Sequence, residues 1–557
     1  GMPLAIELAA AWVRVLSCRE IAQEIEHSLD FLSGSARGLP ARHRSMRAVF
    51  DHSWKLLTEE EQSIVCRLSI FQGGFQREAA EQVTGASLLV LSALLTKSLV
   101  YRSSEGRYDL HELIRQYALE KLVDQPRVHK ETVARHGVYY MKYLAKEDER
   151  LRGTTQREAL TELTAEIENI RRAQDWALIN HKFTLIEGAM RAYLVFYDAL
   201  GWAKEALDTL GRIINTLESI REKSPLSETE ELALAHTLSA RSLFAFRVSQ
   251  HEKARAMLDQ SLEILRRLNE PRVLVEALTF LGIVTTIMGD PARASELFKE
   301  GLQTATAIGD HWFSALCLTE LVGTTVMIGK AENAHEQFQS AVAAWRTTGD
   351  LRFTAFGLNF LSLSAVAVGK YEEARGALKE SIAISTSIGD RWSLGNSYRG
   401  LGLIAQAQGE HSQALDAFHK SCDIFDELGA RWDIARVLSD MGRSIFALGN
   451  DSEAAHTWRE AIRIATETQG MLVVQDAMVG FAGLHAKHGN AKYALELLLV
   501  VLHHPATVQE TKNRASLLRP GVQAQLTPEE IQSAQRLAES KKFESLVEAI
   551  LDQAWKG

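Results

Sequence analysis

The chain has 557 residues, which is too long for a single hydrophobic core, so we expect several structural units. Its 46% hydrophobic and 24% charged residues are typical of a globular protein, and its net charge of −9 lacks the basic field of a nucleic-acid binder. The four cysteines are widely spaced and form no C-x-x-C pair, which predicts reduced thiols in a cytoplasmic protein. No apolar run approaches 18 residues, so we expect no membrane span.

The first 125 residues predict two helical regions. In residues 1–40, apolar side chains at positions 4, 8, 11 and 15 keep a helical period. Residues 41–125 predict helices and one short hairpin, which together make up a winged helix. The expected elements are helices through 49–54, from Thr58-x-x-Glu61, and at 76–83, 88–96 and 111–122, with strands at 98–103 and 107–110.

A winged helix can read DNA, so the composition of its helix at 88–96 matters. A recognition helix needs Arg, Lys, Asn or Gln for base edges and phosphates. The segment from Leu88 to Lys97 has one basic residue and is otherwise apolar or small. We expect this helix to belong to the core and expect no nucleic-acid partner. A transcription regulator that binds DNA through the winged helix stays open as an alternative.

Residues 126–182 predict a helical linker. At 183–230, Gly201, Ala206 and Leu210 have the spacing of the repeat that follows, so this stretch predicts a degenerate repeat and a polar linker.

Residues 231–506 predict seven repeats with a period of 40 residues. Glycine recurs every 40 residues from 289 to 489, alanine follows five positions later, and a large apolar residue comes four positions after that. A second glycine series is followed by Asp310, Asp350 and Asp390. Glycine ends helices and aspartate begins them, so each repeat predicts two helices. One helix pair cannot bury its apolar face alone, so neighbouring pairs must stack.

This pattern resembles the tetratricopeptide repeat, in a unit about six residues longer than the common one. We therefore predict an all-α chain, in which a winged-helix domain is followed by a right-handed α-solenoid of 40-residue repeats. Residues 507–557 are expected to cap its end, with a helix starting at Thr527-Pro528-Glu529-Glu530. Within 391–428, the residues at the family's spacing are Tyr398, Leu401, Gly402, Ala414 and Phe418.

In such repeats the first helix of each pair lines an inner groove, and we predict the binding site there. Asparagine and arginine can hold a peptide backbone or a carboxylate, and phenylalanine can anchor an apolar group. The expected partner is a protein, a peptide or a small-molecule effector. Trp312, Trp392 and Trp432 recur 40 residues apart and are expected to pack between repeats. Alignment on Tyr398 places these candidates in the groove: Phe356, Asn359, Asn396, Arg399, Arg436, Arg443 and Asp476.

Two motifs resemble those of STAND signalling ATPases of the NB-ARC or AP-ATPase type. Met2-Pro3-Leu4-Ala5 is similar to their GLPL motif, and Leu110-His111-Glu112 is similar to their Met-His-Asp motif. The stretch 136–176, with Glu168-Asn169-Ile170-Arg171, resembles their helical linker. The resemblance implies the order ATPase, winged helix, repeat sensor. Because the chain begins at a late ATPase motif, we expect the carboxy-terminal part of a bacterial signalling ATPase or transcriptional regulator.

The resemblance also implies that Pro3 and His111 contact ADP or ATP in an intact protein. This chain has no G-x-x-x-x-G-K-[ST] phosphate loop, so we expect it to hold no cofactor and to be no enzyme by itself. We expect no metal site, because the histidines at 485, 488, 503 and 504 have no third ligand at suitable spacing.

We predict a regulatory region in which the repeats sense an effector and the winged helix relays the signal to an ATPase switch. Without the ATPase module the chain is expected to be monomeric. A stand-alone scaffold or adaptor is the other alternative.

Overall fold

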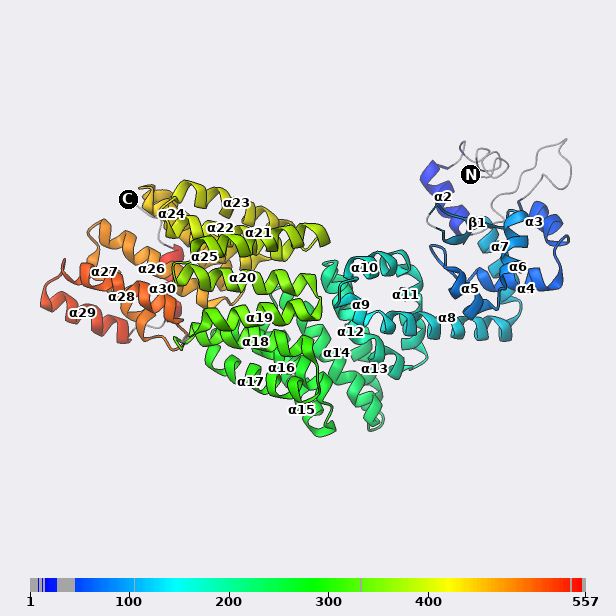
Figure 1. Ribbon diagram of the computed structural model, residues 1–557, viewed down its shortest axis with the longest axis horizontal. Coiled ribbons are helices and arrows are strands. Elements are labelled where there is room, and N and C mark those ends of the chain that lie inside the picture. Colours follow the sequence, from blue (N-terminus) through cyan, green and yellow to red (C-terminus); the bar gives the residue numbers. More distant parts are fainter. Residues whose placement is uncertain are drawn as a thin grey trace. The chain divides into compact units, whose positions relative to one another are not determined.

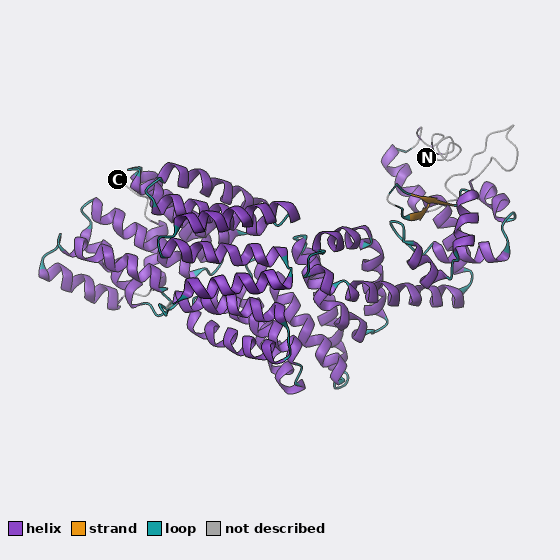
Figure 2. Cartoon of the chain, in the orientation of Figure 1, coloured by secondary structure: helices purple, strands orange, loops and turns teal. Residues whose placement is uncertain are grey.

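The computed structural model describes residues 9, 13, 16–27, 46–104, 106–330, 333–540 and 543–552. These residues are almost wholly helical, as the sequence predicts, and their one sheet has two strands (Figures 1 and 2). The chain divides into two units: residues 1–147 with 160–189, and residues 148–159 with 190–557.

The first unit contains the elements predicted for a winged helix. Thr58 and Glu61 form the expected capping box at the start of a helix. The two strands pair antiparallel, with Val100 opposite Leu110. The elements are α2 (Cys18–His27), α3 (Met46–Trp54), α4 (Glu59–Leu68), α5 (Arg77–Thr84), α6 (Leu88–Thr96), β1 (Val100–Arg102), β2 (Tyr108–Leu110), α7 (Glu112–Val123), α8 (Pro126–Lys146) and α11 (Ile167–Ile179).

The segment predicted as a linker belongs largely to this first unit. Asn169 of α11 is buried; it accepts a hydrogen bond from the backbone N–H of Gln72 and donates one to the carbonyl of Gly74, each at 3.0 Å. The ring of His136 on α8 lies 3.1 Å from the same amide oxygen, and burial lowers the pKa of His136 to about 4. Asn169 thereby fixes α11 to the turn before α5. Its side chain is buried, and hydrogen bonds are stronger in such surroundings than in water.

The second unit is a stack of helix pairs. The degenerate repeat predicted at 183–230 is the hairpin of α12 (Phe183–Ala199) and α13 (Ala203–Arg221), preceded by α9 (Asp148–Leu151) and α10 (Gln156–Ala165); two of the boundaries between the two units fall within α10 and α12. The pairs that follow are α14 (Glu228–Arg247) with α15 (His251–Leu268), α16 (Pro271–Ile287) with α17 (Pro291–Ala307), α18 (His311–Met327) with α19 (Ala334–Thr348), α20 (Leu351–Ala367) with α21 (Tyr371–Ile388), α22 (Arg391–Ala407) with α23 (His411–Glu427), α24 (Arg431–Ala447) with α25 (Asp451–Glu467), and α26 (Met471–Lys487) with α27 (Ala491–His503).

The helix ends are made by the residues that the repeat pattern singles out. Asp310, Asp350 and Asp390 are N-caps, and their carboxylates accept from backbone N–H groups three residues later at 3.0, 3.0 and 3.3 Å. The period-setting glycines adopt positive φ, as at Gly409 with φ 81°. After the repeats come α28 (Gln509–Gln523), α29 (Pro528–Ser540) and α30 (Phe543–Asp552), and the predicted capping box at Thr527 and Glu530 is present.

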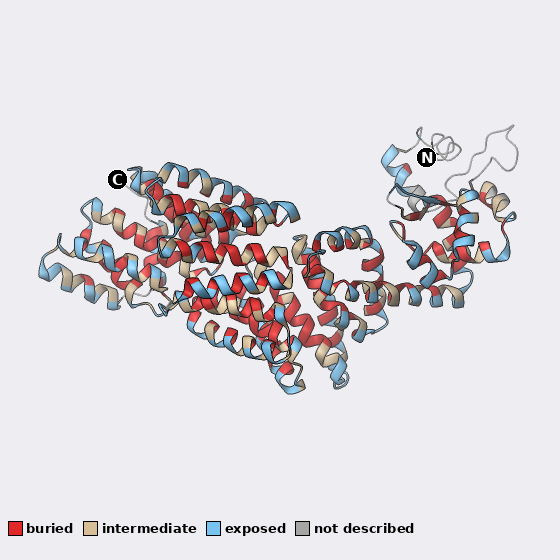
Figure 3. Ribbon diagram, viewed as in Figure 1, coloured by how far each residue is buried: buried red, intermediate tan, exposed pale blue. Residues whose placement is uncertain are grey.

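The repeats wind far enough for the second helix pair of the series, α16 with α17, to meet the last, α26 with α27, and the segment after it. The turn at Gly289 lies against Met471 and Ala506, because a Cβ at Gly289 would be 3.6 Å from the Cβ of Met471 and 3.1 Å from that of Ala506. Likewise a Cβ at Gly329 would lie 3.0 Å from the side chain of Gln509, which begins α28. The inner helices therefore enclose a space instead of lining an open groove. Figure 3 shows buried residues following the faces where helices meet.

In the described ranges no single helix is long and apolar enough to cross a membrane. The pair α5 and α6 meets the length and composition criteria only jointly, bent by 110°, and both helices bury apolar side chains within the first unit.

Close approach within each pair depends on a small residue in the first helix facing a large one in the second. A Cβ added to Gly402 would overlap the ring of Phe418, and one added to Gly442 would overlap the indole of Trp458. Phe418 and Trp458 are almost completely buried, so neither ring can move easily to make room for an added Cβ.

We predict that Gly402→Ala lowers the free energy of unfolding by about 1–3 kcal/mol, because overpacking outweighs the better helix propensity of alanine. The matched control is Gly376→Ala in α21, where an added Cβ meets nothing within 4 Å. That change should raise the free energy of unfolding by about 0.5–1 kcal/mol. Urea denaturation of the full chain measures both. Equal effects of the two substitutions would contradict the packing argument.

Candidate functional site

A large cavity lies within the second unit. Its volume is about 1210 Å³, and it is lined by the inner helices from α14 to α26 together with α12, α19 and α28. Cavities for drug-sized ligands usually measure roughly 300–1,000 Å³, so this one has room for a longer molecule. All seven groove residues predicted from the sequence line it: Phe356, Asn359, Asn396, Arg399, Arg436, Arg443 and Asp476.

One end of the cavity holds four arginines among three aspartates. The Nε of Arg399 donates to Asp440 at 2.6 Å, and Nη1 of Arg443 donates to Asp476 at 2.8 Å. Arg436 donates to Asp433 at 2.8 Å, and Arg514 of α28 forms an ion pair with Asp476. The three aspartates are therefore Asp433, Asp440 and Asp476. We call these seven residues the arginine cluster. Glu510, which also lines the cavity, forms an ion pair with Arg514 at 2.6 Å, so the four arginines and the carboxylates around them balance in charge.

Two arginines of the cluster have lowered pKa values, chiefly because they are buried. Burial, together with the positive charge of Arg399, lowers the pKa of Arg436 to about 10. Burial, together with the charge of Arg443, lowers the pKa of Arg514 to about 9. The Nε of Arg436 is buried and has no hydrogen-bond partner in the described part of the chain. An anion bound here would relieve the repulsion and use this donor.

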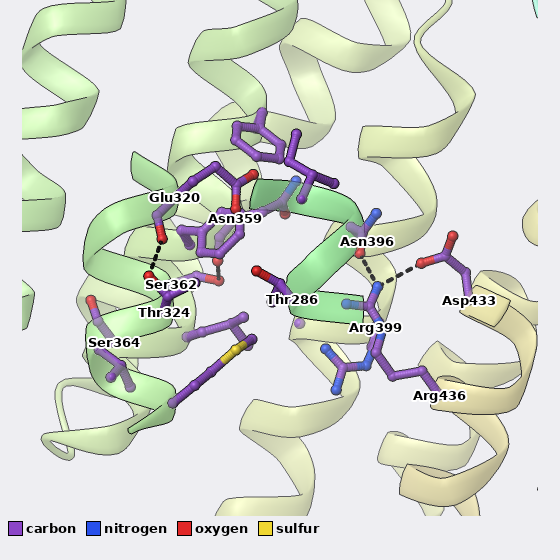
Figure 4. A pocket seen from close by; sticks show the side chains of 18 of the residues that line it. Thr286, Glu320, Thr324, Asn359, Ser362, Ser364, Asn396, Arg399, Asp433 and Arg436 are labelled. Atoms are coloured by element: carbon purple, nitrogen blue, oxygen red, sulfur yellow. Dashed lines mark hydrogen bonds and ion pairs between the residues drawn. The ribbon is translucent and has the colours of Figure 1, made fainter. Parts of the chain in front are cut away.

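The two predicted asparagines have a positioning role in the cavity wall. Asn359 donates to the carbonyl of Ser393 at 3.3 Å and accepts from the hydroxyl of Ser397 at 2.9 Å. Asn396 donates to the carbonyl of Trp392 at 3.0 Å and accepts from Arg436 at 2.5 Å. Asn359 therefore joins α20 to α22, and Asn396 orients the guanidinium of Arg436 (Figure 4).

Aromatic side chains line the middle of the cavity. Phe356 lies 5.0 Å from Phe360 and 6.0 Å from Trp392 between ring centroids. Trp312 and Trp392 also connect repeats, because their indole N–H groups donate to Asp350 at 2.8 Å and Asp433 at 3.1 Å. These tryptophans pack between repeats, as predicted, and also line the cavity.

Glu320 of α18 is a solitary acid beside the aromatic region. Its carboxylate has no hydrogen bond or ion pair within the described residues; only its backbone carbonyl is used, by the hydroxyl of Thr324 at 3.0 Å. Burial raises the pKa of Glu320 to about 7. Figure 4 shows Glu320 on the opposite side of the cavity from Arg399 and Arg436.

Near α12 the cavity wall is held by a buried ion-pair network. Asp198 accepts from Arg247 at 2.8 Å and from Arg352 at 2.7 Å. Burial alone would raise the pKa of Asp198, but the two guanidinium groups hold it well below its usual range. The network joins α12, α14 and α20, which lie far apart in sequence.

The sequence analysis missed several of these side chains, among them Glu320, Asp440, Arg352 and Arg514. Glu320 and Asp440 stand at the repeat position that Phe280, Phe360 and Gly400 occupy elsewhere, so a charge at an apolar position was the available signal. Arg352 interrupts the tryptophan series at 312, 392 and 432 in the same way. Arg514 lies outside the repeats, and only the folded chain brings it to the cluster.

Of the two nucleotide-contact candidates, His111 does not line this cavity. Pro3 is outside the described residues. His111 is the N-cap of α7: its Nδ1 accepts from the backbone N–H of Leu113 at 3.4 Å, and burial lowers its pKa. In this chain His111 therefore has a helix-capping role.

The histidines considered for a metal site have other partners. His485 packs against Tyr493, His488 lies 2.8 Å from Asp451, and the ring of His504 lies 2.9 Å from the amide of Gln475. Within the described ranges no three His, Cys, Asp or Glu side chains are grouped so that they could hold a metal ion.

Comparison with known families identifies the repeats. The model for the tetratricopeptide repeat matches residues 233–307 and 353–427, which are α14 to α17 and α20 to α23. These two stretches match the tetratricopeptide repeat. A model for anaphase-promoting complex subunit 5 matches residues 402–495, within the same solenoid.

Curated relatives come from mycobacteria. A Mycobacterium tuberculosis protein provisionally named an HTH-type transcriptional regulator is 31% identical over 322 residues, which are 56% of this chain and 36% of the relative. An uncharacterized protein of the same organism is 35% identical over 134 residues, covering 22% of this chain and 34% of that protein. This chain thus matches about a third of the length of either relative. The regulator relative agrees with the predicted resemblance to bacterial regulators.

Solved structures with a similar arrangement are distant in sequence. A STAND protein with a tetratricopeptide repeat sensor from Pyrococcus horikoshii is 14% identical, with 93% of this chain and 72% of that one covered and a TM-score of 0.41. A Rap protein complexed with Competence and Sporulation Factor is also 14% identical, with 70% and 100% covered and a TM-score of 0.45.

The lone carboxylate of Glu320 predicts a pH-dependent stability. A folded-state pKa of about 7, above the ordinary value of 4.5, means that stability is fully present below pH 4.5 and is lost as the pH rises through 7. Glu320→Gln does not titrate, so it should gain on the order of 1–3 kcal/mol relative to the unsubstituted chain between pH 5 and pH 8. Denaturation at both pH values tests this. A difference that stays constant with pH would mean that Glu320 has a partner.

The exposed face of α6 predicts no DNA binding. Leu88, Leu89, Ser92 and Thr96 are exposed there, and the nearby Lys97 donates to Glu61 at 2.6 Å. A face with this composition offers only hydroxyl groups for phosphate and base contacts and lacks the Arg, Lys, Asn or Gln of a recognition helix. A mobility-shift assay with random duplex DNA at low salt should show no retention. Retention that Lys97→Ala abolishes would instead assign DNA reading to this helix.

Proposed function

We propose that the second unit is the effector-binding sensor of a STAND-type signalling protein or transcriptional regulator, and that its cavity holds the effector. The proposal rests on the arginine cluster: four arginines gathered at one end of the cavity, of which Arg436 keeps a buried Nε without a hydrogen-bond partner among the described residues. Burying charges is costly, and a solenoid needs none of them to stack its helices. A binding role accounts for their retention.

The proposal assigns the chain binding and no chemistry of its own. The arrangement nearest to a catalytic one is Ser364, His335 and Glu373: the Ser364 hydroxyl lies 3.1 Å from Nδ1 of His335, and Nε2 lies 3.1 Å from Glu373. However, the Ser364 hydroxyl donates to the carbonyl of Leu361 at 2.8 Å. Ser364 also lies inside α20, where the backbone N–H groups are engaged in the helix and form no oxyanion hole. We interpret the trio as a link between α19, α20 and α21.

A bound effector would act by fixing the curvature of the solenoid. The cavity is lined by helices from α12 to α28. One ligand could therefore contact repeats that are far apart along the solenoid. Binding energy available in one curvature alone shifts the equilibrium toward that state. We propose that in the whole protein this shift is relayed through the predicted winged helix to an ATPase switch.

The test uses thermal unfolding of the full chain in low-molecular-mass fractions of a mycobacterial extract. An effector present at about 100 times its Kd stabilises the folded chain by about 2.7 kcal/mol. We expect at least one fraction to raise the Tm by a few degrees and expect Arg436→Gln to remove most of this shift.

The control variant is Arg391→Gln. Arg391 forms an ion pair with Glu427 on the exposed side of the same solenoid and does not line the cavity. It should respond to the active fraction like the unsubstituted chain. An undiminished shift in Arg436→Gln would place the effector outside the cavity, and the absence of a shift with any fraction would overturn the proposed function.

A further inference from the structure

The cavity has two chemically opposite ends. Glu320 on α18 faces it from one side and the arginine cluster, on α22, α24, α26 and α28, faces it from the other (Figure 4). Phe356, Phe360 and Leu403 line the wall between them. A ligand that satisfies this lining has a cationic end, an apolar middle and an anionic end.

Of the two ends of the cavity, the one at Glu320 indicates the charge of the ligand more clearly. The aspartates of the cavity are each paired: Asp198 with Arg247, Asp440 with Arg399, and Asp476 with Arg443. Glu320 has no such partner among the described residues, and its burial is the sole cause of its raised pKa. An uncompensated carboxylate is destabilising, so a protonated amine placed beside it would gain the full benefit of the attraction.

The opposite end is suited to a carboxylate. Arg436 keeps a buried Nε without a hydrogen-bond partner in the described chain, while its Nη2 is held by Asn396 and Asp433. A guanidinium fixed in this way offers a directed donor to an anion. The repulsion among Arg399, Arg436, Arg443 and Arg514 would be reduced by one negative charge.

We propose that the effector is a short linear peptide with free termini and apolar side chains, whose α-amino group lies at Glu320 and whose carboxylate lies at Arg436. This inference rests on the proposed function and specifies the ligand class and its direction. The reverse direction would place a carboxylate against Glu320 and an ammonium against the arginines, which is repulsive at both ends.

The number of inner helices between the two ends sets the peptide length. Glu320 is on α18 and Arg436 is on α24, three inner-helix spacings apart. Packed helices are separated by about 8–10 Å, which gives a path of roughly 24–30 Å before the side chains are allowed for. An extended chain spans about 3.3 Å per residue, so a peptide of roughly six residues covers about 20 Å of this path and the side chains of Glu320 and Arg436 cover the rest.

The experiment uses a pool of synthetic hexapeptides of apolar and small residues, prepared in four forms: free, N-acetylated, C-amidated and doubly blocked. The full chain is incubated with each pool, the retained peptides are identified by mass spectrometry, and their Kd values are measured by calorimetry. We expect acetylation and amidation each to weaken binding about tenfold or more, which corresponds to about 1.4 kcal/mol.

Two variants assign the ends. Glu320→Gln should bind free and acetylated peptides equally while still discriminating against the amidated form. Arg436→Gln should lose the discrimination against amidation and keep that against acetylation. Arg391→Gln should behave like the unsubstituted chain.

The failure of this inference is separable from that of the proposed function. Retention of all four forms with equal affinity would overturn the assignment of the ends while leaving a binding cavity. If no peptide pool is retained, the peptide class is wrong, and the extract titration with Arg436→Gln then decides independently whether the cavity binds an effector.

Discussion

The close approach of the two helices in each repeat is the constraint on which the second unit depends. Where Gly402 faces Phe418 and Gly442 faces Trp458, the absence of a Cβ lets a large buried ring occupy the interface. The same small-against-large contact is present at Gly282 and Phe298, three periods before Gly402 and Phe418. Repetition of one geometry at a fixed interval turns a stack into a superhelix, since each pair is rotated by a similar angle against the last. The cavity is a consequence of that winding.

Charges inside the superhelix have a cost that packing alone does not explain. Asp198 with Arg247 and Arg352 is a compensated network that joins distant helices. Substitution of one of these residues alone would leave an unpaired buried charge. The arginine cluster and Glu320 are different, because in the described chain the first leaves the buried Nε of Arg436 without a hydrogen-bond partner and the second has no partner. Local conflicts of this kind are concentrated at functional sites in natural proteins.

Closure by the chain's own carboxy-terminal part distinguishes this solenoid from an open groove. Arg514 of α28 reaches Asp476 of α26, and Gln509 at the start of α28 lies against the turn at Gly329. A segment that follows the repeats thus supplies part of the cavity wall. Its position depends on contacts with both early and late repeats, so it is well placed to respond to a ligand that alters their separation.

The sequence by itself determined the helices, their pairing and the face that each inner helix presents, because glycine and aspartate caps and a 40-residue apolar period are local signals. It therefore located Arg399, Arg436 and Asp476 on the inner side. It did not reveal that Asn359 and Asn396 are engaged within the wall, since their partners Ser393, Ser397 and Arg436 become neighbours only when inner helices stack. The enclosure of the cavity, the arrival of Arg514 and the isolation of Glu320 were decided by the tertiary structure alone, because each depends on the accumulated rotation of many repeats.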